Sequence, residues 1–261
     1  MRVLVTFAVD AEFAPWRKLH DFRREEIIVK HHHGRPDVVF RGKVKNSRID
    51  VYLTGVGWRG VQAGLYQLIS EKPDLCIISG LAGGLKAELR SGEIVAAREI
   101  RSLSGEGKFR SRRSLLALAE EQGATVVDSF LTNAQIVSQS QFKRSMAEFG
   151  DVVEMESAHI MKMLTGAQVP GIAIRAISDT ADEDLPLDFS RTIDDHGQIG
   201  HRQLLMQIGR YPHKIPALIK FGRRSERATQ NLAAFLEDYI AATEERFTHW
   251  TNVHELEEAT P

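Results

Sequence analysis

The sequence of 261 residues lacks several features that would restrict where the protein works. It contains one cysteine, Cys76, so no disulfide can form within the chain, which fits a reducing compartment. No run of about 18 apolar residues occurs, so we expect no transmembrane helix. The first residues show no basic segment followed by a long apolar stretch, so we expect no signal peptide and a cytoplasmic location.

An excess of charge of one sign is also missing. The 34 basic and 35 acidic residues give a formal net charge of −1, so no overall field attracts nucleic acid or an anionic membrane. We interpret the basic runs Lys108–Arg113 and Lys220–Arg227 as solvated faces. The consecutive His31, His32 and His33 would point in different directions on any regular backbone, so we expect a solvated loop there rather than a metal site.

What the sequence does contain is an alternation of short apolar runs with segments of helical period. Several of the runs are apolar without interruption, which is typical of strands covered on both faces. The alternation predicts an α/β fold of three αβα layers, with helices on both faces of a central sheet. The strands are expected at Val3–Ala8, Ile27–Val29, Ile49–Thr54, Leu75–Ser79, Ile94–Ala97, Thr125–Leu131, Asp151–Glu154 and Gly171–Ile177, and the helices at Gly60–Glu71, Arg113–Gln122, Gln141–Phe149 and Ser157–Leu164, the last ending before Gly166.

The character of the chain changes after Asp184. Residues 185–213 hold turns and scattered charge, and residues 226–243 have the pattern of one amphipathic helix. The tail Thr248–Pro261 is polar and is expected to fray. No segment before residue 184 resembles a linker, so we expect one domain over 1–184 with a helical C-terminal extension, 185–261, packed on it.

Two segments follow expected strands directly. Asp10 and Glu12 come after the first strand, where ligands bind in open α/β sheets, so these acids are placed for proton transfer. Capping of the next helix is the alternative, because acids favour helix N-termini. The glycines of Ser79–Leu85 would leave backbone N–H groups open to a ligand, although a simple turn also explains them. Their spacing matches neither a dinucleotide fingerprint nor a phosphate-binding Walker loop.

A third place carries more carboxylates. Glu154 and Glu156 interrupt an apolar strand that enters an apolar helix, and burying a carboxylate is costly unless it is paired or used. Asp179 and Asp182 end a strand that should be central. Capping of a following helix explains Asp182 better than Asp179.

Taken in order, these segments resemble the nucleoside phosphorylase and nucleosidase superfamily. Its signature is similar to V-E-M-E-S-A at 153–158 and R-A-I-S-D-T-A-D at 175–182. Weaker matches lie at Ala8–Phe13, Thr54–Gly57, Ser79–Leu85 and Ser91–Val95, so the resemblance covers about residues 1–190. Within the superfamily, the chain is most similar to the 5′-methylthioadenosine/S-adenosylhomocysteine nucleosidase branch. The resemblance implies a mixed, partly barrel-like sheet, a homodimer or larger homo-oligomer, and no metal or organic cofactor.

The resemblance also implies a reaction, the hydrolysis of the N-glycosidic bond of a purine nucleoside, expected to be a 5′-substituted adenosine. Asp179 matches the acid that protonates the departing purine, and Ser178 orients it. Glu156 matches the carboxylate that binds the ribose hydroxyls, and Met155 packs against the sugar. Glu12 matches the residue that activates water.

Four further residues are expected to bind substrate. Ala82 and Gly83 belong to the glycine segment, and Val137 and Ser138 fall near the family's base-stacking segment. The aromatic residue that usually stacks on the base is missing from that segment. The sequence therefore leaves the choice of base open.

Phosphate is the alternative nucleophile. Phosphorolysis needs fixed cationic donors, for which Arg17 and Arg59 are candidates, whereas Glu12 suits water and would repel a phosphate dianion. Leu81, an apolar residue in the glycine turn, departs from the hydrolytic and the phosphorolytic branch alike. We therefore favour hydrolysis.

Two further alternatives concern the extension and the fold. Leu185–Phe189 and Tyr211–Arg227 resemble bacterial hopanoid-associated phosphorylases, which act on adenosine with a large apolar 5′ group. The extension would then shape a 5′ pocket or a lid; a brace for the sheet or a dimer surface is equally open. A non-catalytic nucleoside-binding protein with this fold is the other class, and it would have no need of Glu12, Glu156 and Asp179 together.

Overall fold

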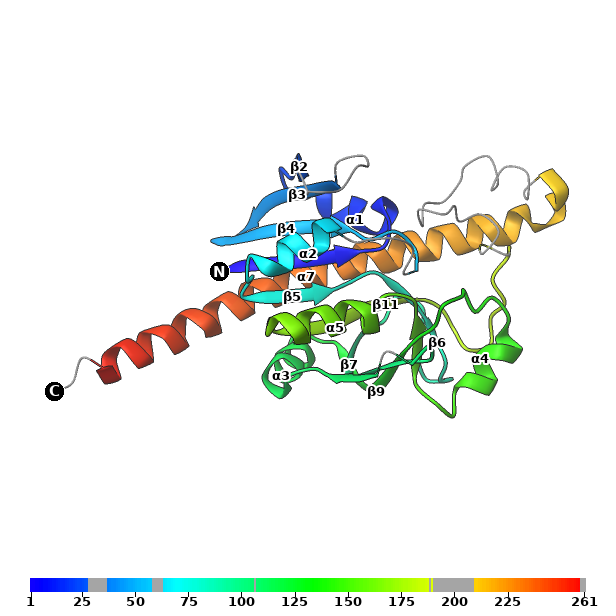
Figure 1. Cartoon of the computed structure of the whole chain (residues 1–261). Coiled ribbons are helices and arrows are strands. Elements are labelled where there is room, and N and C mark those ends of the chain that lie inside the picture. Colours follow the sequence, from blue (N-terminus) through cyan, green and yellow to red (C-terminus); the bar gives the residue numbers. More distant parts are fainter. Residues whose placement is uncertain (28–36, 58–62, 106, 188, 190–208, 259–261) are drawn as a thin grey trace.

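The computed structural model describes residues 1–27, 37–57, 63–105, 107–187, 189 and 209–258, with only the backbone for 248–258. The three histidines at 31–33 and Arg59 lie outside these residues, and so do the expected strand residues 28 and 29. Figure 1 shows the sheet with helices on either side and the long C-terminal helix crossing one face.

One mixed sheet organises the described chain, with its strands in the order β2-β3-β4-β1-β5-β11-β6-β10-β9-β7-β8. Parallel pairs join β1 to β4 and β5, and β5 to β11, whereas β6 pairs antiparallel with β10. The strands are β1 (Arg2–Phe7), β2 (Arg23–Ile27), β3 (Asp37–Val44), β4 (Ser47–Leu53), β5 (Leu75–Ile78), β6 (Leu81–Gly84), β7 (Ile94–Ser102), β8 (Lys108–Arg110), β9 (Thr125–Thr132), β10 (Val152–Glu154) and β11 (Gly171–Asp179).

Half of this sheet closes on itself. Strand β11 pairs with β6 along one part of its length and with β7 along another, so β11, β6, β10, β9 and β7 form a ring of five strands. The expected mixed, partly barrel-like sheet is confirmed. The closure brings the carboxyl ends of β10 and β11 to the edge where β1 also ends, although these strands are far apart in sequence.

Helices cover both faces of the sheet, which confirms the predicted αβα arrangement. Val3, Val5 and Phe7 of β1 pack into a core that includes residues of α3 and α7, whereas Leu4 packs into a second core with α2 and α5. This alternation follows from the period of two along a strand. The helices are α1 (Asp10–Arg17), α2 (Ala63–Ser70), α3 (Arg113–Glu121), α4 (Ser140–Met146), α5 (Ser157–Ala167) and α7 (Ile215–Glu258), with a short 3-10 helix η2 at Pro212–Lys214.

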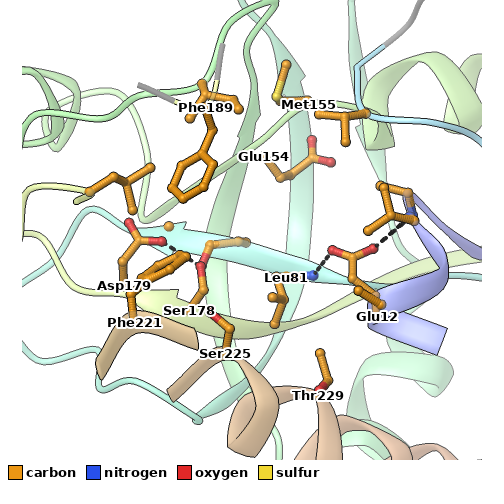
Figure 2. A pocket seen from close by; sticks show the side chains of 18 of the residues that line it. Glu12, Leu81, Glu154, Met155, Ser178, Asp179, Phe189, Phe221, Ser225 and Thr229 are labelled. Atoms are coloured by element: carbon orange, nitrogen blue, oxygen red, sulfur yellow. Dashed lines mark hydrogen bonds between the residues drawn. The ribbon is translucent and has the colours of Figure 1, made fainter. Parts of the chain in front are cut away.

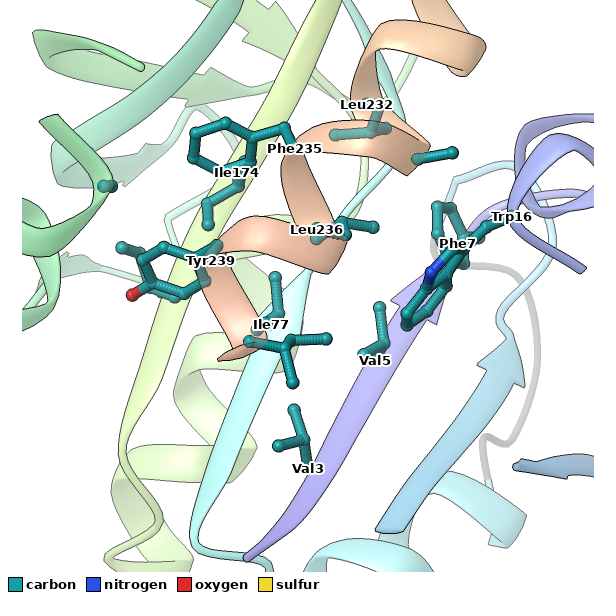
Figure 3. Packing of buried hydrophobic residues seen from close by; sticks show 14 of the residues in the cluster. Val3, Val5, Phe7, Trp16, Ile77, Ile174, Leu232, Phe235, Leu236 and Tyr239 are labelled. Atoms are coloured by element: carbon teal, nitrogen blue, oxygen red, sulfur yellow. The ribbon is translucent and has the colours of Figure 1, made fainter. Parts of the chain in front are cut away.

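Helix α7 is much longer than the 226–243 segment that the sequence predicts. Pro216 lies at its second position, where the missing N–H costs no hydrogen bond, so the helix can begin there. The prediction that the tail frays is wrong as far as Glu258, because the helix continues to that residue. Figure 3 shows Leu232, Leu236 and Tyr239 facing the sheet. A domain boundary at residue 184 stays a prediction.

Two other local predictions differ from the structure. The glycine segment after β5 forms strand β6 rather than a turn, because its backbone pairs with both β10 and β11. Helix α5 does not end before Gly166; it continues to Ala167 and stops at Gln168, which has a left-handed φ of 58°. Among the described helices, none has the length and apolar character needed to cross a membrane.

The packing of α7 generates a stability prediction. Leu236 is fully buried in the core beneath the sheet, so Leu236→Ala should lower the free energy of unfolding by about 2–5 kcal/mol. Asp238→Ala, an exposed position on the same helix, is the control and should cost less than about 0.5 kcal/mol. Urea unfolding measures both. Equal costs for the two variants would show that α7 does not complete the core.

Candidate active site

A cavity of about 590 Å³ lies where β1, β10 and β11 end and where α1 and α7 pass the sheet. This volume is in the range of small-molecule sites. Eight of the nine predicted site residues line it, and Figure 2 shows Glu12 and Asp179 on opposite sides of it. The eight are Glu12, Ala82, Gly83, Val137, Met155, Glu156, Ser178 and Asp179. Ser138 is not among the lining residues, and its carbonyl accepts the N–H of Leu185 at 2.8 Å.

Glu12 is held by backbone donors from two segments. One carboxylate oxygen accepts the N–H of Ala8 at 2.9 Å and of Val9 at 3.4 Å, and the other accepts the N–H of Leu81 at 2.8 Å. Glu12 therefore does both of the things that the sequence left open: it caps α1 and faces the cavity. Burial raises its pKa, against the opposing effects of Arg175 and these N–H donors.

Arg175 does not line the cavity; its guanidinium is buried behind Glu154 and Glu156, with 1% of the residue's surface exposed. Its Nη2 donates to Glu154 at 2.6 Å and Glu156 at 3.1 Å, and its Nη1 donates to the Ser79 carbonyl at 3.1 Å. Burial opposes its charge, but the surrounding carboxylates outweigh burial, so the pKa of Arg175 lies above its ordinary value. The arginine stays charged and neutralises only part of the acidic cluster.

Glycine at position 80 makes this arrangement possible. Its φ is 135°, which L side chains rarely adopt. A Cβ there would lie 2.6 Å from Nη1 of Arg175 and 2.8 Å from the Glu12 carboxylate. Gly80 therefore lets the cation and Glu12 approach the same turn of backbone.

Glu154 is the structural member of the cluster. A single carboxylate oxygen accepts the N–H groups of Glu156 at 3.0 Å and Ser157 at 2.8 Å, together with the Ser157 hydroxyl and Arg175. The other oxygen accepts the hydroxyl of Thr132. With both oxygens occupied, Glu154 fixes the start of α5 and holds Arg175 in place.

Glu156 has fewer partners and faces the cavity. It accepts the N–H of Gly57 at 2.8 Å and one N–H of Arg175. Burial is the main cause that raises the pKa of Glu156 to about 7; Arg175 opposes the shift, and the neighbouring Glu154 adds to it. With these two hydrogen bonds, the Glu156 carboxylate still has lone pairs that can accept hydroxyl groups or bind a cation.

Asp179 ends β11 at the other side of the cavity. One of its oxygens accepts a hydrogen bond from the hydroxyl of Ser178 at 2.5 Å, and the other accepts one from the ammonium of Lys143. Gly83 faces the same carboxylate: a Cβ there would lie 3.1 Å from Oδ2 of Asp179. The glycine segment therefore leaves room beside Asp179, which supports its interpretation as a place of close approach.

The aromatic rings of the cavity come from the C-terminal segments that the sequence offered for a 5′ pocket rather than from the expected base-stacking segment. Phe189 and Phe221 line it, with ring centroids 5.7 Å apart, while Val137 supplies only an aliphatic side chain in the segment where a stacking ring was missing. Phe221 belongs to α7, so the C-terminal extension forms part of the cavity wall.

Sequence reasoning assigned no role to Arg175 or Lys143. The signal for Arg175 was present, because an arginine inside an otherwise apolar strand must find buried partners. Lys143 offered no such signal, since it stands next to Arg144 in a short polar helix that looks like a solvated face. Its burial depends on how α4 docks against the 180–184 loop.

Of the two candidate phosphate ligands, the structure describes Arg17, and it does not line the cavity. Arg17 pairs with Asp10 at 2.6 and 3.1 Å and is not a lining residue. Among the described residues that line the cavity, Lys18 is the one lysine or arginine, and it is exposed. Within the same part of the chain, no group of histidine, cysteine and acidic side chains is arranged to hold a metal ion.

The raised pKa of Glu156 generates a prediction about stability and pH. A carboxyl whose pKa is higher in the folded state stabilises the fold when protonated, and this contribution disappears as pH rises from about 4.5 through about 7. Between about pH 5 and pH 8, the wild type should therefore lose about 1–3 kcal/mol of unfolding free energy relative to Glu156→Gln.

Chemical denaturation at a series of pH values measures this difference. Glu120→Gln, at an exposed position of α3, is the control and should follow the wild type. A Glu156→Gln curve parallel to the wild type would mean that Glu156 ionises in the fold as it does in the unfolded chain.

Comparison with known proteins agrees with this geometry. The chain is 29% identical over 175 residues to the 5′-methylthioadenosine/S-adenosylhomocysteine nucleosidase of Glaesserella parasuis serovar 5 (strain SH0165). The aligned region covers 58% of this chain and 76% of that relative. The nucleosidase of the same name from Neisseria meningitidis, solved with methylthio-immucillin-A, superposes with a TM-score of 0.65 at 20% identity over 92% of this chain and 99% of that one. Futalosine hydrolase of Helicobacter pylori strain 26695 gives a TM-score of 0.65 at 19% identity, over 93% of this chain and 98% of that one.

These structural similarities show the fold, and a family model extends the relationship along the sequence. The model described as the Phosphorylase superfamily matches residues 2–206. That range includes every predicted site residue from Glu12 to Asp179. The chain therefore belongs to the phosphorylase superfamily.

Proposed function

We propose that this protein is an enzyme that hydrolyses the N-glycosidic bond of a purine nucleoside and releases the base. The single observation that carries the proposal is that Glu12, Glu156 and Asp179, from three distant segments, line one cavity. The names of the similar nucleosidases support a 5′-substituted adenosine of the 5′-methylthioadenosine/S-adenosylhomocysteine type as substrate.

The residues divide the reaction between the two sides of the cavity. Breaking the bond leaves positive charge on the sugar and negative charge on the purine. Asp179, oriented by Ser178, protonates the purine as it leaves. Glu156 binds the ribose hydroxyls, and its negative charge stabilises the cationic sugar. Met155, next to Glu156 in sequence and also in the wall, packs against the sugar.

Water is the nucleophile that suits the side of the cavity where Glu12 lies. Glu12 accepts three backbone N–H groups and is fixed in position, and its raised pKa makes it a better base than an ordinary glutamate. A phosphate dianion would meet Glu12 and Glu156 there. The donors of Arg175 that face them are already bonded to Ser79, Glu154 and Glu156, so they offer phosphate little in return.

An apolar part of the wall suits the 5′ substituent. Val9, Val56, Phe189 and Phe221 all line the cavity and offer no polar side-chain atoms. Because polar groups occupy the positions proposed for the base and the ribose hydroxyls, an apolar 5′ group has these side chains as its matching surface. The same apolar surface also suits a larger apolar 5′ group. It therefore keeps a second candidate function, the phosphorolysis of an adenosine that carries such a group.

Replacement of the two acids generates a prediction about catalysis. Glu12→Gln and Asp179→Asn should each lower kcat by about 10²-fold or more, because each removes one proton transfer. Asp10→Asn, an exposed neighbour paired with Arg17, is the matched control and should keep the wild-type rate. Release of adenine from 5′-methylthioadenosine, followed with and without inorganic phosphate, measures all four proteins.

The same assay separates the candidate functions. Hydrolysis predicts a rate independent of phosphate and free 5-methylthioribose as the sugar product. A phosphate-dependent rate with a sugar 1-phosphate product would establish phosphorolysis instead. Binding of nucleoside without turnover under either condition would leave the non-catalytic class.

We also propose that the protein acts in the cytoplasm as a homodimer or larger homo-oligomer. The face between α2 and α5 supports the oligomer, because a groove there is lined by Tyr66, Ile69 and Met163, and Tyr66 is 57% exposed. A second copy packed on this face would bury the exposed ring. Sedimentation at micromolar concentration distinguishes a dimer from a monomer.

A further inference from the structure

Lys143 is a buried cation in direct contact with the proposed acid. It has 0% of its surface exposed, although it belongs to the short helix α4. Its ammonium donates to Oδ2 of Asp179, to the Thr180 carbonyl at 3.0 Å and to the Glu183 carbonyl at 2.7 Å. The three protons of the ammonium thus have three acceptors, which is the full capacity of a lysine.

This contact decides where a proton can reside on Asp179. An ammonium only donates, so Oδ2, the oxygen that it contacts, accepts its hydrogen bond, and the adjacent positive charge disfavours a proton on that oxygen. The acid proton is therefore favoured on Oδ1, the oxygen beside the Ser178 hydroxyl. That hydroxyl also lies 3.2 Å from the carbonyl of Ala82, so Ser178 can accept from a protonated Asp179 while it donates to Ala82.

The other charged groups around the pair are already matched. Between α4 and the loop after β11, Arg144 pairs with Asp182 at 3.3 Å, and Asp184 accepts the N–H of Ser140 at 2.7 Å. Glu183 pairs with Arg224 of α7, and Lys86 lies 3.8 Å from Asp151. On the other side, Arg175 of β11 is paired with Glu154 at the end of β10 and with Glu156 at the start of α5. The charge of Lys143 is therefore the one that acts on Asp179 directly.

We propose that Lys143 is a positioning residue that confines the transferable proton of Asp179 to Oδ1 and favours its release to the base. This inference rests on the proposed function. In the step, the Oδ1–H bond of Asp179 breaks and an N–H bond forms on the purine. The glycosidic electron pair goes to the departing base, and Asp179 becomes a carboxylate between the Ser178 hydroxyl and the Lys143 ammonium. Glu12 takes the proton of the attacking water, so the protons balance.

The test compares the pH dependence of kcat in Lys143→Met and the wild type. Methionine keeps an apolar stem of similar length but removes the positive charge. Asp179 should then hold its proton to higher pH, so the alkaline limb should move up by about one pH unit or more. The plateau value of kcat should fall about tenfold with little change in KM, because the proton is free to occupy either oxygen.

Two matched variants separate positioning from general damage. Arg144→Met removes a neighbouring charge on the solvent side of α4 and should leave the alkaline limb unchanged. Lys143→Arg keeps the charge and should keep the limb close to its wild-type position. An unchanged limb in folded Lys143→Met, or the same shift in Arg144→Met, would overturn the proposal.

A measurement on the unsubstituted protein covers the case in which Lys143→Met does not fold. A neutron structure of the deuterium-exchanged wild type, at the pH of the base-release assay, locates the protons on Asp179 and Lys143 directly. The proposal expects a deuteron on Oδ1 of Asp179 and none on Oδ2; a deuteron on Oδ2, or none on either oxygen, would refute it. This outcome is independent of turnover, so failure of the proposed reaction would be recognised separately by the absence of base release from the wild type.

Discussion

The rest of the site depends on one buried ion cluster, in which the guanidinium of Arg175 lies among three carboxylates. Removing an arginine from water is costly, and its contacts with Glu154 and Glu156 offset that cost. Glu12 adds a third negative charge that acts on the same cation. One positive charge cannot neutralise three negative ones, so the cavity wall keeps a demand for a proton or another cation.

This imbalance connects the fold to the chemistry. Strand β11 carries Arg175 and Asp179, and closure of the five-strand ring places both beside the ends of β10 and β6. Burial raises the pKa values of Glu12 and Glu156 because it disfavours their charged forms. A proton or a cation beside these carboxylates offsets that cost. A sugar that develops positive charge during bond cleavage meets that demand, whereas a phosphate dianion does not. On the far side of the cavity, Asp179 is paired with Lys143. The side proposed for the leaving base therefore has a matched pair of charges, whereas the side proposed for the sugar has an excess of carboxylates.

The sequence predicted those parts of the molecule that local pattern determines. Apolar runs located most of the central strands, and the motifs around Glu156 and Asp179 identified residues that do meet in one cavity. Strand β6 was not predicted, because its glycines carry no periodic signal, and only pairing with β10 and β11 makes the segment a strand. Lys143 was missed for a related reason: its place in the site comes from how α4 docks, which no spacing in the sequence records. For the segment around Phe221 the resemblance offered a 5′ pocket as one of several roles, and only the docking of α7 places the ring in the cavity.

The central claim is that the cluster around Arg175 favours a positively charged sugar. Calorimetric affinity for two adenosine analogues of the same shape, one with a protonated nitrogen in the sugar ring and one uncharged, tests it most directly. The account predicts that the cationic analogue binds at least about 10²-fold more tightly. Equal affinity for the two analogues would contradict it, because the excess negative charge would then be doing nothing for the sugar.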